Sequence, residues 1–144
     1  MKLLVPIFLL WFLAFDPSWA GHEQEKTCDR MRYEDKNQVD YGPLRMAVVR
    51  GEAADAQSVP VPQVCVGIFT DVDHKLIAST ETDESGGFHF DGIPGGSYRL
   101  VASYDGFSVA NAKVRVEPKV NQKKRLALHM RFAGIDSTSF FELK

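Results

Sequence analysis

From residue 44 onward, apolar and polar positions alternate in short runs that predict β-strands. The runs are rich in β-branched and aromatic residues, and clusters of Gly, Pro and Asp separate them at intervals of roughly ten residues. No sustained helical period is present, so long amphipathic helices are not expected. The pattern predicts an all-β, seven-stranded antiparallel Greek-key sandwich with strands over 45–51, 64–70, 76–82, 88–90, 97–104, 108–116 and 125–132.

The second of these strands shows which side faces the core. Val64, Val66 and Ile68 share one face of an extended chain, and Cys65 lies on the other. If the branched aliphatic side chains face the interior, Cys65 points outward.

The start of the chain predicts a secretory signal peptide over 1–20. Lys2 is followed by an apolar run over 3–15 that is too short to span a bilayer comfortably. Ser18 and Ala20 are small residues at the positions that a signal peptidase inspects. We therefore expect a mature chain that begins at Gly21 and is secreted or periplasmic, with an uncleaved anchor as the alternative.

The mature chain is long enough for one domain and too short for two well-packed ones. We divide it into an extended N-terminal arm over 21–43, the sandwich over 44–132 and a tail over 133–144, which docks as an extra edge strand or lies on a partner. The net charge is −2, which does not favour nucleic acid. Without a second long apolar run, no membrane span is expected after cleavage.

Two cysteines remain in the mature chain, Cys28 and Cys65. An even pair in an oxidising compartment predicts a disulfide. With Cys65 pointing outward, the bridge would hold the arm across the outer face of the sheet. A metal site is a poor alternative, because no histidines lie at ligand spacing from the two thiols.

Two neighbouring motifs resemble the signature of carboxypeptidase regulatory-like domains. The run TDESGGFHF (82–90) is similar to the family's Thr-Asp turn with glycine that leads to a Phe-x-Phe strand, and IPGGSYRL (93–100) to its apolar-Pro-Gly corner that leads to a Tyr-x-Leu strand. The resemblance covers about 44–132, although Gln63 stands where the family usually has glycine. The residues that match the motifs are Thr82, Asp83, Gly86, Phe88, Phe90, Ile93, Pro94, Gly95, Tyr98 and Leu100.

The resemblance implies a prealbumin-like (transthyretin-like) sandwich that accompanies enzymes or receptors as a folding, tethering or recognition module. It also implies that these motif residues are structural and that the module performs no chemistry. The arm that carries Cys28 lies outside the family pattern.

The residues themselves predict no catalytic site and no cofactor. No Gly-x-Ser-x-Gly elbow occurs, and the ending over 139–144 lacks the Tyr-Arg-Gly-Ser of transthyretin-related hydrolases. A small hydrolase therefore remains the least favoured function.

No metal site is predicted either. His74, His89 and His129 are scattered along the chain, and the Ca²⁺ pattern begun by Asp71 and Asp73 fails at Lys75. A copper site at a free Gly21-His22 amino terminus is weighed against an ordinary chain end.

The function that the sequence favours is a non-catalytic module for protein binding or scaffolding, with a partner that the sequence does not identify. The alternative is carbohydrate binding through surface aromatics. Acidic residues crowd the middle of the chain and basic residues its last third, so the two signs either separate to opposite ends of the sandwich or mix. The aromatic candidates for binding are Tyr33, Tyr41, Tyr104 and Phe107, and in the tail Phe140 and Phe141.

Overall fold

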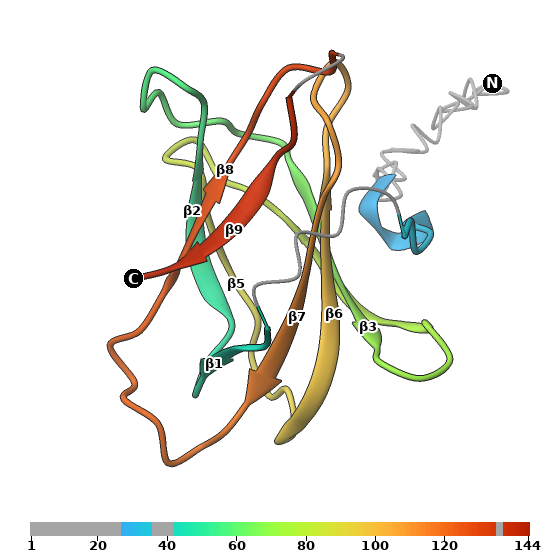
Figure 1. Cartoon of the computed structure of the whole chain (residues 1–144), viewed down its shortest axis with the longest axis vertical. Coiled ribbons are helices and arrows are strands. Elements are labelled where there is room, and N and C mark those ends of the chain that lie inside the picture. The colour runs from blue at the N-terminus through green and yellow to red at the C-terminus, as the bar shows by residue number, and fades with distance from the viewer. Residues whose placement is uncertain (1–26, 36–41, 135–136) are drawn as a thin grey trace, which may run out of the picture.

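The computed structural model describes residues 27–35, 42–134 and 137–144, and in these residues nine strands form two facing sheets (Figure 1). The five-stranded sheet has the order β1-β7-β6-β3-β4, and the four-stranded sheet the order β5-β2-β8-β9. The strands are β1 (Leu44–Met46), β2 (Arg50–Ala54), β3 (Cys65–Thr70), β4 (Leu76–Glu81), β5 (Gly87–His89), β6 (Gly96–Ser103), β7 (Ala110–Val116), β8 (Leu126–His129) and β9 (Phe140–Leu143).

One apolar core fills the space between the sheets. Val66 and Ile68 of β3 are fully buried, as the alternation predicted, and Leu128 reaches the same core from the other sheet. Phe88 and Phe90 lie on one side of the β5 segment and are 5% and 6% exposed. The all-β sandwich follows from this burial of alternate side chains in two layers.

The prediction of seven antiparallel strands is wrong. The structure has more strands, and β1–β7 and β2–β8 are parallel pairs, so both sheets are mixed. The error begins at the predicted strand 45–51, which is two strands in different sheets. Met46 and Val49 are both buried; three positions apart in one strand they would face opposite sides, so the chain leaves one layer and enters the other between them.

The tail forms a strand at the edge of the four-stranded sheet. β9 pairs antiparallel with β8, with Phe141 opposite Leu128. Phe141 is 5% exposed and belongs to the core. The suggestion that Phe141 is a surface binding residue is therefore wrong, because alternation along β9 turns it inward and its neighbour Phe140 outward.

A disulfide joins Cys28 to Cys65, as predicted, with 5.2 Å between the Cα atoms. The arm is not fully extended, because Cys28 lies in a short 3₁₀ helix, η1 (Thr27–Arg30), on the outer side of the five-stranded sheet (Figure 1). The signal peptide predicted over 1–20 lies outside the described residues.

The stapled arm covers part of that outer face. The ring of Tyr33 meets Phe69 edge-on at 5.7 Å between centroids, and Phe69 is only 1% exposed although it faces away from the core. Asn111 of β7 donates a hydrogen bond from Nδ2 to the carbonyl of Glu34, at 2.7 Å. The arm is thus held by packing and hydrogen bonds in addition to the covalent bridge.

The first motif makes the turn between β4 and β5. The buried hydroxyl of Thr82 accepts a hydrogen bond from Val64 N and donates one to Val61 O, at 2.9 and 2.8 Å, which ties the proline-rich lead-in of β3 to the end of β4. Asp83 accepts hydrogen bonds from the backbone N–H groups of Ser85 and Gly87. Hydrogen bonds from the Ser85 hydroxyl and the Gly87 N–H lower the pKa of Asp83 below its usual value.

The second motif makes the corner before β6. The hydroxyl of Tyr98 donates a hydrogen bond to the carbonyl of Pro94 at 2.6 Å, which closes the Pro-Gly-Gly corner. Ile93 packs against the core, and Leu100 is fully buried. In both motifs the residues build turns and core.

Removal of the disulfide should lower stability without removing the sandwich. The bridge closes a separation of 37 residues, which in the chain-entropy model is worth about 4 kcal/mol. We expect the Cys28→Ser/Cys65→Ser protein to lose about that free energy of unfolding in urea while its circular dichroism stays that of a β protein, because the arm lies outside the core. Equal urea midpoints of the two proteins would contradict this account.

Gly86 and Gly92 offer a matched test of the first turn. Both have positive φ, at +76° and +68°, but a Cβ on Gly86 would lie 2.3 Å from Ala53 O, whereas nothing lies within 4 Å of one on Gly92. An alanine at either position carries a backbone strain of about 1–2 kcal/mol. Gly86→Ala should cost about 2 kcal/mol more than Gly92→Ala in urea unfolding, because a backbone carbonyl must also move. Equal losses would show that the close approach to Ala53 is not needed.

Candidate functional site

Three aromatic side chains gather at one end of the sandwich. Tyr104 and Phe107 lie in the β6–β7 loop and Phe132 follows β8; their centroids are 5.8 Å apart for Tyr104–Phe107 and 4.6 Å for Phe107–Phe132. Phe132 is 64% exposed and Tyr104 37%. We call these three residues the aromatic cluster.

Backbone hydrogen bonds hold the two loops of the cluster together. Ser108 N donates to Arg131 O at 2.8 Å, and Ala133 N donates to Gly106 O at 2.9 Å. The fully buried Ser139 adds a link, because its N–H donates to the Ser108 hydroxyl and its own hydroxyl accepts from Arg131 N, at 2.7 and 2.8 Å. The three rings are therefore carried by loops whose conformation is already fixed by hydrogen bonds before any partner binds.

The sequence singled out Tyr104 and Phe107 and missed Phe132. Leu126, Leu128 and Met130 face the core, so period-two alternation pointed Phe132 inward as well. The strand ends at His129, and beyond it the chain turns Phe132 toward solvent. Of the other aromatic candidates, Phe140 stacks on His129 at 4.5 Å, Tyr33 stacks on His74 at 3.8 Å, and Tyr41 lies outside the described residues.

A groove of about 670 Å³ lies beside the aromatic cluster, and we call it the arm groove. Arg30 and Glu34 line it from the stapled arm, and Tyr104, Asp105 and Phe107 line it from the β6–β7 loop. The disulfide is part of its wall through Cys65. The groove therefore depends on the arm being held against the sheet.

The arm groove carries more acidic than basic side chains. Glu34, Glu81 and Asp105 line it, against Arg30. Tyr104 and Phe107 line the arm groove and also belong to the aromatic cluster. Carboxylates beside aromatic rings suit peptides with basic or polar side chains as well as sugars.

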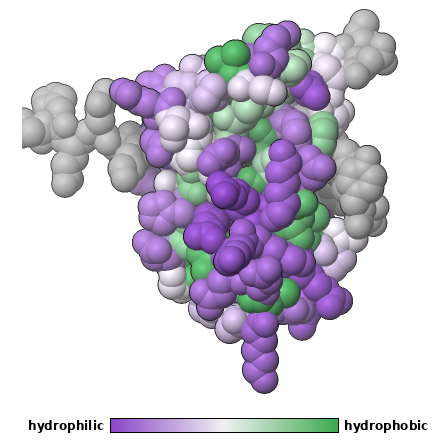
Figure 2. Space-filling view, turned by 90° about the vertical axis from the view of Figure 1, so that its left-hand side faces the viewer, coloured by the Kyte–Doolittle hydropathy of each residue, from purple (hydrophilic) through white to green (hydrophobic). Residues whose placement is uncertain are grey.

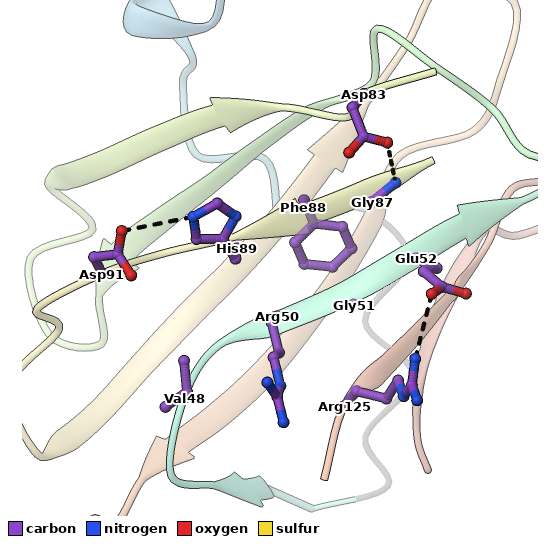
Figure 3. A pocket seen from close by; sticks show the side chains of 10 residues that line it. All are labelled: Val48, Arg50, Gly51, Glu52, Asp83, Gly87, Phe88, His89, Asp91 and Arg125. Carbon is purple, nitrogen blue, oxygen red and sulfur yellow. Dashed lines mark hydrogen bonds and ion pairs between the residues drawn. The ribbon is translucent and has the colours of Figure 1, made fainter. Parts of the chain in front are cut away.

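A second groove of about 500 Å³ lies on the outer face of the four-stranded sheet, and Figure 3 shows its lining side chains. Arg125 pairs with Glu52 at 3.3 Å, and His89 with Asp91 at 3.5 Å. Gly51 lies where a Cβ would come within 2.3 Å of Leu126 O. We call this second groove the sheet groove.

The histidines do not come together. His74 stacks on an arm tyrosine, His89 contacts a turn aspartate, and His129 pairs with Glu142 at 2.9 Å. Among the residues that the structure describes, no group of three or more His, Cys, Asp and Glu side chains is placed to hold a metal ion. The Gly21-His22 site lies outside these residues.

Asp71 and Asp73 have separate partners and do not form a shared cation site. Arg99 Nε lies 2.8 Å from Asp71, and Lys113 lies 3.4 Å from it. Burial alone would raise the pKa of Asp71, but hydrogen bonds from Arg99 and Lys113 outweigh it and hold this pKa below the usual value. Asp73 accepts a hydrogen bond from the Thr70 hydroxyl and pairs with Lys75 at 3.5 Å.

The ends of the sandwich differ in charge. Apart from Arg131, the described loops around the aromatic cluster carry no Lys or Arg, but they carry Asp55, Asp83, Glu84 and Asp105. The loops at the opposite end carry lysines, and there the carboxylates of Asp71, Asp73, Asp91 and Glu117 each have a basic partner. The two signs are therefore mixed at the lysine-bearing end, whereas the strand-connecting loops around the aromatic cluster are mainly acidic.

No helix in the described part of the chain is both long enough and apolar enough to cross a membrane.

Comparison with known proteins bears on the family of this chain. Among solved structures, 3-chlorocatechol 1,2-dioxygenase from Rhodococcus opacus 1CP is similar over 77% of this chain and 63% of its own, with 14% identity and a TM-score of 0.37. A likeness this weak carries no argument about either fold or function, and among curated proteins none matches the chain. The sequence model of the carboxypeptidase regulatory-like domain matches residues 48–131, which include both motifs and most of the two sheets. Because that match covers more than half of the chain, the protein belongs to the carboxypeptidase regulatory-like domain family.

Proposed function

We propose that this protein is an exported, non-catalytic module that binds another protein through the aromatic cluster and the arm groove. The observation that carries the proposal is the exposure of Phe132 at 64% in a stack with Phe107. Large aromatic side chains that stay exposed on a rigid support are typical of protein interaction surfaces. Little ordering is needed on binding, because hydrogen bonds already join the two loops.

Export is supported by the disulfide together with the predicted signal peptide over 1–20. Disulfides persist in oxidising compartments such as the extracellular space and the periplasm, and they are rare in the cytosol. Cys28 and Cys65 make the bridge that holds one wall of the arm groove. The binding surface therefore suits an oxidising compartment.

A non-catalytic role is supported by the family and by the use of the polar side chains near the cluster. The hydroxyls of Ser108 and Ser139 are 3.0 Å apart and bond to each other and to the backbone. In this arrangement they act as supports of the loops. An activated nucleophile would instead need a base and an oxyanion site beside it.

Carbohydrate binding is the second candidate, and the position of Tyr104 favours it. Its ring is 37% exposed and lies next to Asp105 at the arm groove. A ring that stacks on a sugar face and a carboxylate that accepts from hydroxyls are a common combination at sugar-binding surfaces. Specific hits on a glycan array that Tyr104→Ala abolishes would favour this candidate over protein binding.

A photo-crosslinker at position 132 tests the protein-binding proposal. Benzoylphenylalanine in place of Phe132 should form a specific protein adduct in the native extracellular or periplasmic fraction. The matched control places it at Val72, which is 93% exposed on the β3–β4 loop at the opposite end. We expect no such adduct from position 72, and we expect Tyr104→Ala/Phe107→Ala to weaken the position-132 partner's affinity about 30-fold, since two aromatic contacts are removed.

The same adducts from both positions, or none from position 132, would contradict the proposal. A loss of binding caused by unfolding is recognised from the urea midpoint of each variant.

A further inference from the structure

A row of basic side chains crosses the β5-β2-β8-β9 sheet, from β5 and β2 to the residues next to the start of β8 and the end of β9. Arg50 of β2 is paired with His89 of β5. Gly51 is paired with Leu126 in the parallel β2–β8 ladder, so Arg50 lies beside Arg125. Arg125 and Lys144 exchange backbone hydrogen bonds of 3.0 and 2.8 Å, which brings Lys144 to the other side of Arg125.

All four side chains of this row point away from the core. Gly51, Phe88 and Leu126, which alternate with them, are buried, and Leu143 packs against the core. Figure 3 shows Arg50 and Arg125 next to each other at one edge of the sheet groove. With strands about 4.8 Å apart, the row is about 14 Å long.

The β7–β8 loop adds three lysines to the row. Arg50 Nη2 donates a hydrogen bond to Gln122 O, so the loop that carries Lys119, Lys123 and Lys124 lies against the row. Hydrophilic side chains gather over this side of the molecule in Figure 2. We call the four row residues and these three lysines the basic row.

Most of these cations have no carboxylate partner. Glu52 pairs with Arg125 and Asp91 with His89, but within the described residues Arg50, the three loop lysines and Lys144 make no ion pair. Like charges side by side on neighbouring strands are destabilising. A bound anion would therefore reduce the repulsion between the neighbouring cations of the row. The whole chain has a net charge of −2, so any attraction for anions must come from this local surface.

The adjacent row limits what kind of anion fits. Two residues along the strands, on the same outer face, Ala127 is paired with Glu52 on β2 and with Glu142 on β9. An anionic bilayer or a nucleic-acid duplex is charged over a broad surface and would meet these glutamates. A single anionic chain laid across the strands would follow the line of cations, and the carboxylates beside it would be those of Glu52 at Arg125 and Asp91 at His89.

We propose that the basic row binds an anionic polysaccharide that runs across the four strands. The segment 119–125, KVNQKKR, has the density of Lys and Arg that is typical of heparin-like binding patches. Arginine guanidinium groups suit sulfate and carboxylate oxygens through paired hydrogen bonds. The surface lies away from the aromatic cluster, so one module can hold a glycan and a protein at the same time.

Binding of the full exported chain to immobilised heparin tests this proposal. Arg50→Gln/Lys144→Gln should weaken the affinity about 30-fold and reduce its salt dependence, because two contacts to the polyanion are lost. The control Arg32→Gln/Lys75→Gln removes the same charge from the arm and the β3–β4 loop and should bind like the unchanged protein. The Phe132→Ala variant should bind heparin with the affinity of the unchanged protein, because Phe132 lies in the aromatic cluster. Heparin binding and protein binding can therefore be tested independently of each other.

Several outcomes would overturn the proposal. These are no binding to heparin at low salt, equal losses in the test and control variants, or tighter binding to phosphatidylglycerol vesicles or duplex DNA than to heparin. The last result would reassign the basic row to a membrane or to nucleic acid.

Discussion

The apolar layer between the two sheets is the constraint on which the rest of the structure depends. Each strand contributes alternate side chains to this layer. Between Met46 and Val49 the chain crosses from one sheet to the other, and there it leaves regular strand geometry so that both side chains stay buried. With the inner faces committed to the core, only the outer faces, the edges and the loop ends remain for contacts with other molecules. The aromatic cluster, the arm groove and the basic row all lie on these remaining surfaces.

The disulfide adds a groove to a sandwich that already has a complete core. It holds the arm against an outer face that would otherwise expose Phe69, and the same contact closes one wall of the arm groove. A groove built in this way depends on the redox state of the compartment, whereas the core does not. This difference explains how a family domain gains a surface from a segment outside the family match at 48–131.

Charge and aromatic character divide the molecule into two regions with different chemistry. The cluster end combines exposed rings with carboxylates, whereas the outer face of the four-stranded sheet and the β7–β8 loop carry the basic row, most of whose side chains make no ion pair within the described residues. Because the two regions are separate, occupation of one leaves the other accessible. Under the two proposals above, one module would connect a protein partner to a polysaccharide.

The sequence by itself determined the β class, most strand positions, the outward direction of Cys65 and the family, because period-two burial and turn motifs are local properties of a chain. Only the tertiary structure decided the rest. The division of 45–51 into two strands, the parallel pairs and the exposure of Phe132 depend on which strand lies next to which, and alternation holds no information about distant partners. The basic row is the clearest case: His89, Arg50, Arg125 and Lys144 are far apart in the sequence, and strand register alone brings them into line.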